Sequence, residues 1–228
     1  MNSKLSIQQH SDVERRTHIW QKVNYRAVFL LFFFGSIAGF FMEGLWSQAR
    51  TGQWVHHSAL IWGPFCLVYG IGAVVMYAAY FYVEHRNTVI QFFAYFLIGS
   101  IVEYVSSAVQ QLCLGSTSWD YSGEAMNLGG RICLGMALVW GALGIIVSRF
   151  IFPLIKKPLS RLKGKRGIVL CGVLTLYMAA NIFATTAVIW RWHDRVNDIP
   201  AQNLMETVID RTYTDTRMEA LFPNMNFV

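Results

Sequence analysis

The sequence predicts an all-α, polytopic membrane protein, a helical bundle with about five transmembrane helices and the N-terminus inside. The first observation is composition: 54% of the 228 residues are hydrophobic and only 14% are charged, whereas a soluble domain is about 25% charged. The second is a set of apolar segments long enough to cross a bilayer as helices of about 20 residues. The third is the clustering of lysines and arginines beside these segments. We therefore expect a multi-pass protein of the cell membrane.

The apolar segments divide the chain into three parts. Residues 1–26 form a basic leader that we expect in the cytoplasm, and residues 27–190 form the transmembrane domain. Residues 191–228 form a tail expected on the outer face, either packed over the outer links or solvated. Every span should be a helix, because an open strand cannot satisfy its backbone hydrogen bonds in lipid. The five predicted spans are about 27–46, 60–83, 89–112, 132–154 and 167–190.

The charges of the links predict the orientation. The leader carries five Lys and Arg residues, and the link at Lys156–Arg166 carries six. The links 47–59 and 113–131 carry one each, Arg50 and Arg131. Because basic residues concentrate on the cytoplasmic side, the two basic stretches should lie inside. The two weakly charged links and the tail should then lie outside.

Several function classes are disfavoured. The net charge of +6 comes from flanks of apolar segments rather than from one basic face, so no nucleic-acid partner is expected. No motif for nucleotide hydrolysis, nucleophilic catalysis or haem binding is present, so we expect no cofactor and name no catalytic residue. His56 and His57 are adjacent but have no further ligands nearby in sequence, so no metal site is predicted. A disulfide between Cys113 and Cys133 is left open.

Two carboxylates inside predicted spans are the strongest chemical signal. An ionised side chain in hydrocarbon costs at least about 2.5–3.5 kcal/mol, so Glu43 and Glu103 should face a partner, a cavity or a function. Both fall in the outer halves of their spans, and Arg131 lies at the outer start of the fourth span. Residues 119–130, here named the cap segment, are too polar to span a bilayer and too aromatic and Gly-rich for an ordinary solvated loop. We predict a polar site beneath the cap segment, whose candidate residues are Glu43, Glu103, Arg131, Asp120, Asn127, Tyr121 and Trp119.

Structural explanations for the same residues stay open. Arg131 could neutralise the glutamates in a structural ion network, since buried ion pairs need not serve chemistry. Asp120 and Asn127 are good turn residues, and Trp119 and Tyr121 are typical of the interfacial aromatic belt. Asn181, in the fifth span, is predicted to hold helices together.

A weak internal duplication is also visible. Gly35-Ser-Ile precedes Glu43, and Gly99-Ser-Ile precedes Glu103, although the spacings differ. Each is followed by an outer link with a Trp, as in a parallel repeat.

Four stretches carry a resemblance to a known family: FFMEG at 40–44, WGPFCLVYGIGA at 62–73, VEYVSS at 102–107 and WDYSGEAMNLGGRICL at 119–134. Over residues 32–153 the sequence resembles the bacterial ABC-transporter permease family of the CmpB type. The resemblance implies a polytopic inner-membrane protein that takes part in transport. It also implies a separate ATPase subunit, for which the docking surface would be Lys156–Arg166, a stretch that fits anionic lipid equally well.

Three functions follow from these observations. The first is a permease-like transporter component with a polar site opening to the outer face. The second is a membrane enzyme acting on a lipid or lipid-linked substrate at the outer leaflet, with a glutamate as general base and Arg131 holding a phosphate. The third is a non-catalytic membrane scaffold. Membrane lipids are the expected partners, and an oligomer is left open.

Overall fold

The protein is an all-α membrane bundle, as predicted, with one two-stranded ribbon. The structure is a computed structural model that describes residues 25–155 and 164–228. The basic leader and most of the predicted docking stretch lie outside the described residues. The elements, in chain order, are α2 (Tyr25–Thr51), α3 (Leu67–Val83), α4 (Thr88–Leu114), β1 (Ser116–Thr117), α5 (Leu134–Ile146), η1 (Val147–Ile151), α7 (Lys165–Val196), α8 (Leu204–Thr212), α9 (Asp215–Leu221) and β2 (Asn226–Phe227).

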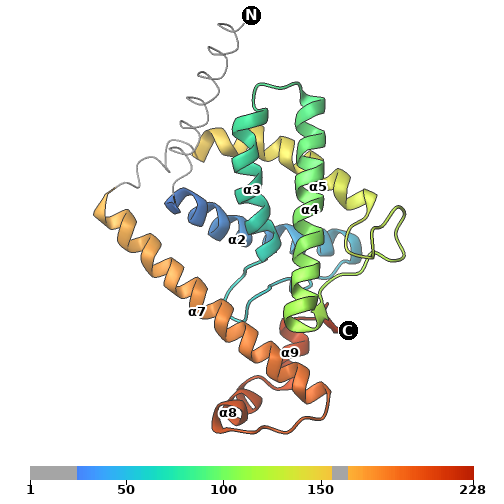
Figure 1. Cartoon of the computed structure of the whole chain (residues 1–228), viewed down its shortest axis with the longest axis vertical. Coiled ribbons are helices and arrows are strands. Elements are labelled where there is room, and N and C mark those ends of the chain that lie inside the picture. Colours follow the sequence, from blue (N-terminus) through green and yellow to red (C-terminus); the bar gives the residue numbers. More distant parts are fainter. Residues whose placement is uncertain (1–24, 156–163) are drawn as a thin grey trace, which may run out of the picture.

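Two helical hairpins form the centre of the fold. Helix α2 packs on α3, α4 packs on α5, and α3 contacts α4 through the short turn that joins them. Figure 1 shows α3 and α4 running antiparallel, with α2 and α5 crossing them. Helix α7 passes diagonally beside this group and carries α8 and α9 near its C-terminal end. The chain therefore consists of two paired units and one outlying long helix.

Among the described residues, four helices are long and apolar enough to cross a membrane: Tyr25–Thr51, Thr88–Leu114, Leu134–Ile155 and Lys165–Val196. The fourth predicted span thus includes α5, the π-helical turn η1 and the residues up to Ile155. Helix α3 is apolar but has only 17 residues, which is at the lower limit for crossing the bilayer.

The start of the second predicted span is not helical. Residues 60–66 form a loop, and α3 begins only at Leu67. Pro64 has no N–H to donate, and Gly63 before it adopts φ +93°, a conformation that glycine tolerates and a helix does not allow. Pro64, expected in the first helical turn, therefore lies in the loop instead.

Helix α7 holds this loop through Asn181, whose side chain is fully buried. Asn181 Nδ2 donates to the Trp62 carbonyl at 2.6 Å, and Trp62 N–H donates to Asn181 Oδ1 at 3.2 Å. Tyr177 Oη donates to the same carbonyl at 2.8 Å. Non-helical backbone at membrane depth has to find its partners within the protein. Asn181 supplies them, so it joins α7 to a loop rather than to another helix.

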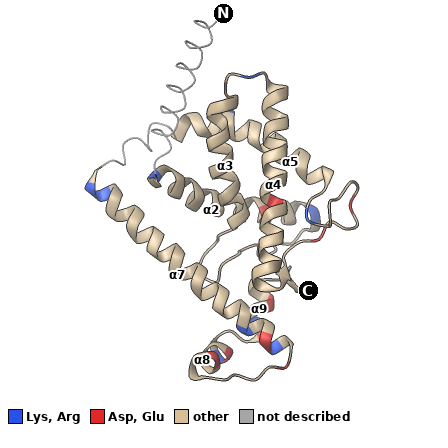
Figure 2. Cartoon of the chain, in the orientation of Figure 1, with Lys and Arg blue, Asp and Glu red and all other residues tan. Residues whose placement is uncertain are grey.

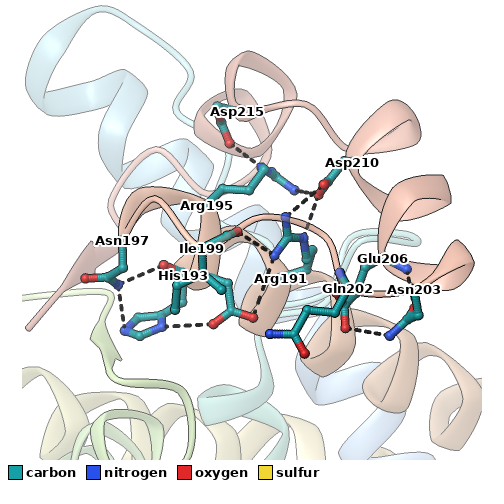
Figure 3. Close-up of polar contacts among 11 residues, drawn as sticks. Arg191, His193, Arg195, Asn197, Ile199, Gln202, Asn203, Glu206, Asp210 and Asp215 are labelled. Atoms are coloured by element: carbon teal, nitrogen blue, oxygen red, sulfur yellow. Dashed lines mark hydrogen bonds and ion pairs between the residues drawn. The ribbon is translucent and has the colours of Figure 1, made fainter.

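An ion network docks the C-terminal tail on α7 (Figure 3). Arg191 is only 4% exposed and binds the carboxylate of Asp210 with two hydrogen bonds of 2.9 Å. Arg195 binds the same carboxylate at 2.7 Å and Asp215 at 2.8 Å. The tail is therefore ordered from α8 onward, which is the packed alternative of the two predicted.

The two loops and the tail gather at one end of the bundle. Strand β1, just after α4, pairs antiparallel with β2 near the C-terminus. The Leu221 carbonyl contacts His56 Nδ1 at 3.0 Å, which joins the tail to the 52–66 loop. Figure 2 shows α3 and α5 largely free of charge, whereas charged residues cluster at the start of α7, the α3–α4 turn and the tail.

Candidate functional site

Glu103 is the most deeply buried carboxylate of the predicted site. It lies on α4, is 4% exposed, and accepts two hydrogen bonds. Tyr121 Oη donates to Oε1 at 2.9 Å, and Trp140 Nε1 donates to Oε2 at 2.5 Å. Both donors are neutral, and no ion pair reaches Glu103 within the described part of the chain. The side chain is therefore held by two neutral donors and has no counter-ion among the described residues.

Trp140 of α5 reaches Glu103 because α4 has no side chain at Gly99. A Cβ at Gly99 would lie 2.3 Å from Trp140 Cγ, far inside van der Waals contact. The indole therefore lies flat against α4, one turn before the carboxylate to which it donates. Glycine at this position allows the two helices to approach closely.

Arg131 lies beside this carboxylate but binds other partners. Its guanidinium donates to Ser107 Oγ at 3.1 Å and to Gln111 Oε1 at 2.5 Å, and it stacks over the Tyr104 ring at 5.8 Å. Ser107 is one turn from Glu103 on α4, so the arginine and the glutamate share a face of this helix. The direct pairing of Arg131 with Glu43 or Glu103, which the sequence left open as a structural alternative, is absent among the described residues. A polar row of Glu103, Ser107 and Gln111 takes its place.

Arg131 also does not open α5, as its position in the sequence suggested. The helix begins at Leu134 after the N-cap residue Cys133. The Arg131 carbonyl accepts from Trp119 Nε1 at 3.0 Å, which fixes the backbone before the helix. Arg131 is thus positioned by the cap segment and reaches α4 from a loop.

Asp120 and Asn127 shape the cap segment itself. Asp120 is exposed and accepts from the Ser122 N–H and hydroxyl, both at 2.9 Å. Asn127 donates to the carbonyls of Ser122 and Glu124 and accepts from Gly130 N–H. These are turn interactions, so the structure brings neither residue to Glu103.

Tyr121 joins the cap segment to the buried carboxylate. Its backbone N–H donates to the Gly130 carbonyl at 2.7 Å, which closes the loop. Burial, and then the charge of Glu103, raise the pKa of the Tyr121 phenol above its ordinary value. The phenol therefore stays protonated across the physiological range and acts as a donor.

Glu43 belongs to a second, connected node. Tyr69 Oη of α3 donates to Glu43 Oε1 at 2.6 Å. The rings of Tyr69 and Trp140 lie 5.2 Å apart, so an aromatic pair separates the two glutamates. Of the predicted residues, Glu103, Tyr121, Arg131 and Trp119 surround one site, Glu43 adjoins it, and Asp120 and Asn127 serve the loop.

The family can be assigned from the chain itself. A profile of the family described as "Putative ABC-transporter type IV" matches residues 30–186, which is more than half of the chain. The chain belongs to this family. No curated protein and no solved structure matches it. Family membership confirms the resemblance predicted from the sequence and, with the apolar helices, makes the protein a membrane transporter component.

The site of this family member includes residues that sequence reasoning missed. Trp140 and Tyr69 hold the two glutamates, and Gln111 holds Arg131. A signal for the aromatic pair was present, since Leu-Val-Tyr-Gly at 67–70 recurs as Leu-Val-Trp-Gly at 138–141. Gln111 had no such signal, because the neighbouring Gln110 is equally polar. Only the orientation of α4 about its axis determines which of the two glutamines faces Arg131.

The four cysteines of the family member are free thiols. Cys113 is exposed and Cys133 is buried, so the disulfide left open by the sequence is absent. The described residues hold no cluster of three or more His, Cys, Asp or Glu side chains that could bind a metal ion.

Proposed function

We propose that the chain is a permease-like component whose polar site lies on α4 at Glu103, Ser107 and Gln111, beneath the cap segment and open to the outer face. One observation carries the proposal: Glu103 is buried with two neutral donors and no counter-ion among the described residues. Isolated charges in membrane spans are expensive and are typical of substrate or ion pathways. A purely structural carboxylate would be stabilised more strongly by the arginine that lies beside it.

The arrangement of the chain ends supports the proposed orientation. The cap segment follows β1, and β1 pairs with β2 of the tail, so the cap segment and the tail share one side. Five crossings with the N-terminus inside would place both outside. Helix α3 is short for a crossing, but the non-helical residues 60–66 before it extend its reach.

An ATPase subunit is the proposed partner inside. Lys156–Arg166 remains the candidate docking stretch, and Lys165 and Arg166 are exposed in the first turn of α7. An ATPase that drives transport has to contact the cytoplasmic side, which is opposite the Glu103 site in this orientation.

We place this function ahead of the lipid enzyme because of Arg131. Arg131 already donates to Ser107 and Gln111, so a phosphate would have to bind to the remaining N–H groups of a guanidinium that is held against α4. The neutral phenol and indole on Glu103 also oppose a general-base role, because both carboxylate oxygens already accept hydrogen bonds.

The test begins with identification of the solute. Mass spectrometry of extracts and media from cells with and without the chain should reveal a solute whose distribution depends on it. Glu103→Gln and Arg131→Gln are each expected to reduce this dependence at least tenfold. Persistence of the wild-type distribution in both variants would overturn the proposal.

Matched controls separate function from folding. Glu124→Gln removes an exposed acid of the cap segment and should leave the solute distribution unchanged. Each variant is also measured for membrane content and for melting temperature after purification. If a variant reduces the chain-dependent solute distribution only as much as it reduces the amount of protein in the membrane, the scaffold function is favoured instead.

A further inference from the structure

The two hairpins α2–α3 and α4–α5 repeat the same set of contacts. In the first, Gly39 lies against Tyr69, and a Cβ there would be 2.4 Å from the ring. In the second, Gly99 lies against Trp140 in the same way. Glu43 and Glu103 follow their glycines by four residues, and each accepts a hydrogen bond from the aromatic residue that covers that glycine.

Further contacts keep the same register. A Cβ at Gly70 would meet Phe32, and a Cβ at Gly141 would meet the Phe92 ring. The close pair of Gly35 with Ala73 recurs as Tyr95 with Gly144, with the small residue exchanged between the helices. Every first-helix residue is thus related to its counterpart by a shift of 60 positions, and every second-helix residue by 71.

The sequence supports the match of the two hairpins. Leu-Val-Tyr-Gly at 67–70 matches Leu-Val-Trp-Gly at 138–141 with the shift of 71, whereas Gly-Pro-Phe-Cys-Leu at 63–67 matches Gly-Arg-Ile-Cys-Leu at 130–134 with a shift of 67. Helix α5 thus has about one more turn than α3 between its N-cap and its aromatic residue. Both glycines that open the second match have positive φ. Cys66 and Cys133 are the N-caps of α3 and α5. The register predicted from the sequence, which matched Gly35 with Gly99, is therefore wrong by four residues. With Gly39 matched to Gly99, the unequal spacings before the glutamates disappear.

The two repeats differ in what the loop brings to the glutamate. In the second repeat, the hairpin α4–α5, the hydroxyl of the loop residue Tyr121 donates a hydrogen bond to Glu103. In the first repeat, the loop turns back along α2: Trp54 covers Gly44, and the His56 ring lies 5.2 Å from the Phe40 ring. The loop segment that ends at His57 therefore folds back over residues 40–44 of α2, which include Glu43.

His57 presents a donor without an acceptor. Asn224 Nδ2, which can only donate, lies 3.3 Å from His57 Nδ1, so Nδ1 accepts and Nε2 carries the proton. Nε2 is buried and has no hydrogen-bond partner among the described residues. A buried N–H without an acceptor is costly. Glu43 in turn uses only Oε1, for Tyr69, within the described part of the chain.

We propose that Glu43 and His57 form a subsite for a hydroxyl group of a neutral polar solute. A hydroxyl can donate to the carboxylate and accept from the imidazole N–H at the same time. The second hairpin shows that such a carboxylate accepts from a hydroxyl as well as from the aromatic residue, since Tyr121 and Trp140 both donate to Glu103.

The electrostatic surroundings agree with a neutral imidazole. Burial lowers the pKa of His57, and His56 lowers it further, while the Glu43 carboxylate opposes both. His57 is therefore uncharged at neutral pH, with its single proton on Nε2. The subsite stands on these contacts alone and does not require the Glu103 proposal.

Glycerol is a suitable probe. In histidine-labelled (¹⁵N) protein in lipid nanodiscs, glycerol should shift the His57 Nε2 resonance saturably, a signal assigned by its loss in His57→Gln. Glu43→Gln should weaken the apparent affinity at least fivefold, because hydrogen bonds to a charged acceptor are about twice as strong as neutral ones. Glu124→Gln, the same change at an exposed acid of the cap segment, should leave the affinity unchanged.

Competition binding and a more conservative variant separate loss of the subsite from loss of folding. In competition with labelled glycerol, His57→Gln should still bind because its amide can donate in place of Nε2, whereas His57→Ala should not. Variants that lose the wild-type melting transition are replaced by Glu43→Asp, for which reduced binding is expected. The absence of any His57 shift with glycerol, or equal weakening by Glu43→Gln and Glu124→Gln, would overturn the subsite. Wild-type transport in Glu103→Gln, with glycerol binding at His57 intact, would count against the Glu103 site only.

Discussion

At the scale of residues, the site depends on how closely aromatic rings approach glycine-bearing helix faces. Trp140 can donate to Glu103 only because Gly99 leaves room for the indole. Hydrogen bonds from two neutral donors, rather than a counter-ion, then hold the carboxylate. A substitution at Gly99 should therefore disturb the site as much as a substitution at Glu103.

Gly99→Ala should destabilise the bundle by about 1–3 kcal/mol, the usual cost of overpacking. The added methyl group would lie 2.3 Å from Trp140 Cγ, so the indole or the helix has to move. Gly172→Ala on α7 is the control, because nothing lies within 4 Å of its added Cβ. Thermal unfolding in detergent would measure both, and equal melting temperatures would show that Trp140 does not pack on Gly99.

At the scale of elements, α7 fixes the two parts of the chain that are not helical spans. Its central Asn181 binds the backbone of the 58–66 loop, and its last turns bind the tail through Arg191 and Arg195. Helix α7 also buries apolar side chains against α2, the loop and the tail, among them Cys171, Met178 and Ile189, and the polar contacts add to this packing.

Asn181→Leu should loosen the 58–66 loop. The change leaves Trp62 N–H without its acceptor and removes one of two donors to the Trp62 carbonyl, at a cost of about 1–3 kcal/mol for each buried group left unpaired. Hydrogen exchange should rise at residues 58–66 and stay unchanged in α5. Phe183→Leu, at an exposed position of the same helix, serves as the control. Hydrogen exchange in Asn181→Leu that equals that of the wild type would contradict the role of Asn181 in holding the loop.

Docking of the tail should depend on pH through Asp210. Arg191, and then Arg195, hold the pKa of this carboxyl below its ordinary value, so the folded state binds its proton less readily than the unfolded state. The resulting stabilisation is complete above the unfolded pKa of about 3.9 and is lost as pH falls through the lower folded value.

Pepsin cleavage, expressed relative to its rate on an unstructured peptide at the same pH, should therefore release α8 and α9 faster near pH 2 than near pH 5. In Asp210→Asn this difference should shrink, with release already fast at pH 5, whereas Asp198→Asn should behave as wild type. A tail that is cleaved at the same rate at both pH values in the wild-type chain would contradict the docking by Asp210.

At the scale of the whole molecule, the sequence was enough to predict the helical bundle, the family and the burial of Glu103. A long apolar segment can cross a bilayer only as a helix, and an isolated carboxylate in such a helix has to face the protein interior or a cavity. It was not enough for the partners of Arg131, because a guanidinium can reach several groups on one helix face and only packing selects among them. The loop at 60–66 was missed because its residues are as apolar as a span. The duplication was visible, but the Gly-Ser-Ile triplets at 35–37 and 99–101 gave a register that is wrong by four residues.

The orientation of the molecule can be checked by cysteine labelling in a background without the four native cysteines. A membrane-impermeant maleimide added outside intact cells should label Ser122→Cys in the cap segment and should not label Lys165→Cys at the start of α7. Positive charge near Lys165 favours the inside. The reverse pattern would invert the proposed topology.

The most direct measurement of the central claim, that a polar site on α4 opens outward, is the reactivity of Ser107→Cys in the same background. Ser107 is 3% exposed and binds Arg131, so a thiol there can react only when the site opens. We expect an impermeant thiol reagent to modify it from the outside, slowly in the otherwise native chain and at least tenfold faster with Arg131→Gln. A thiol that reacts from neither side, or only from the inside, would contradict the outward-facing site.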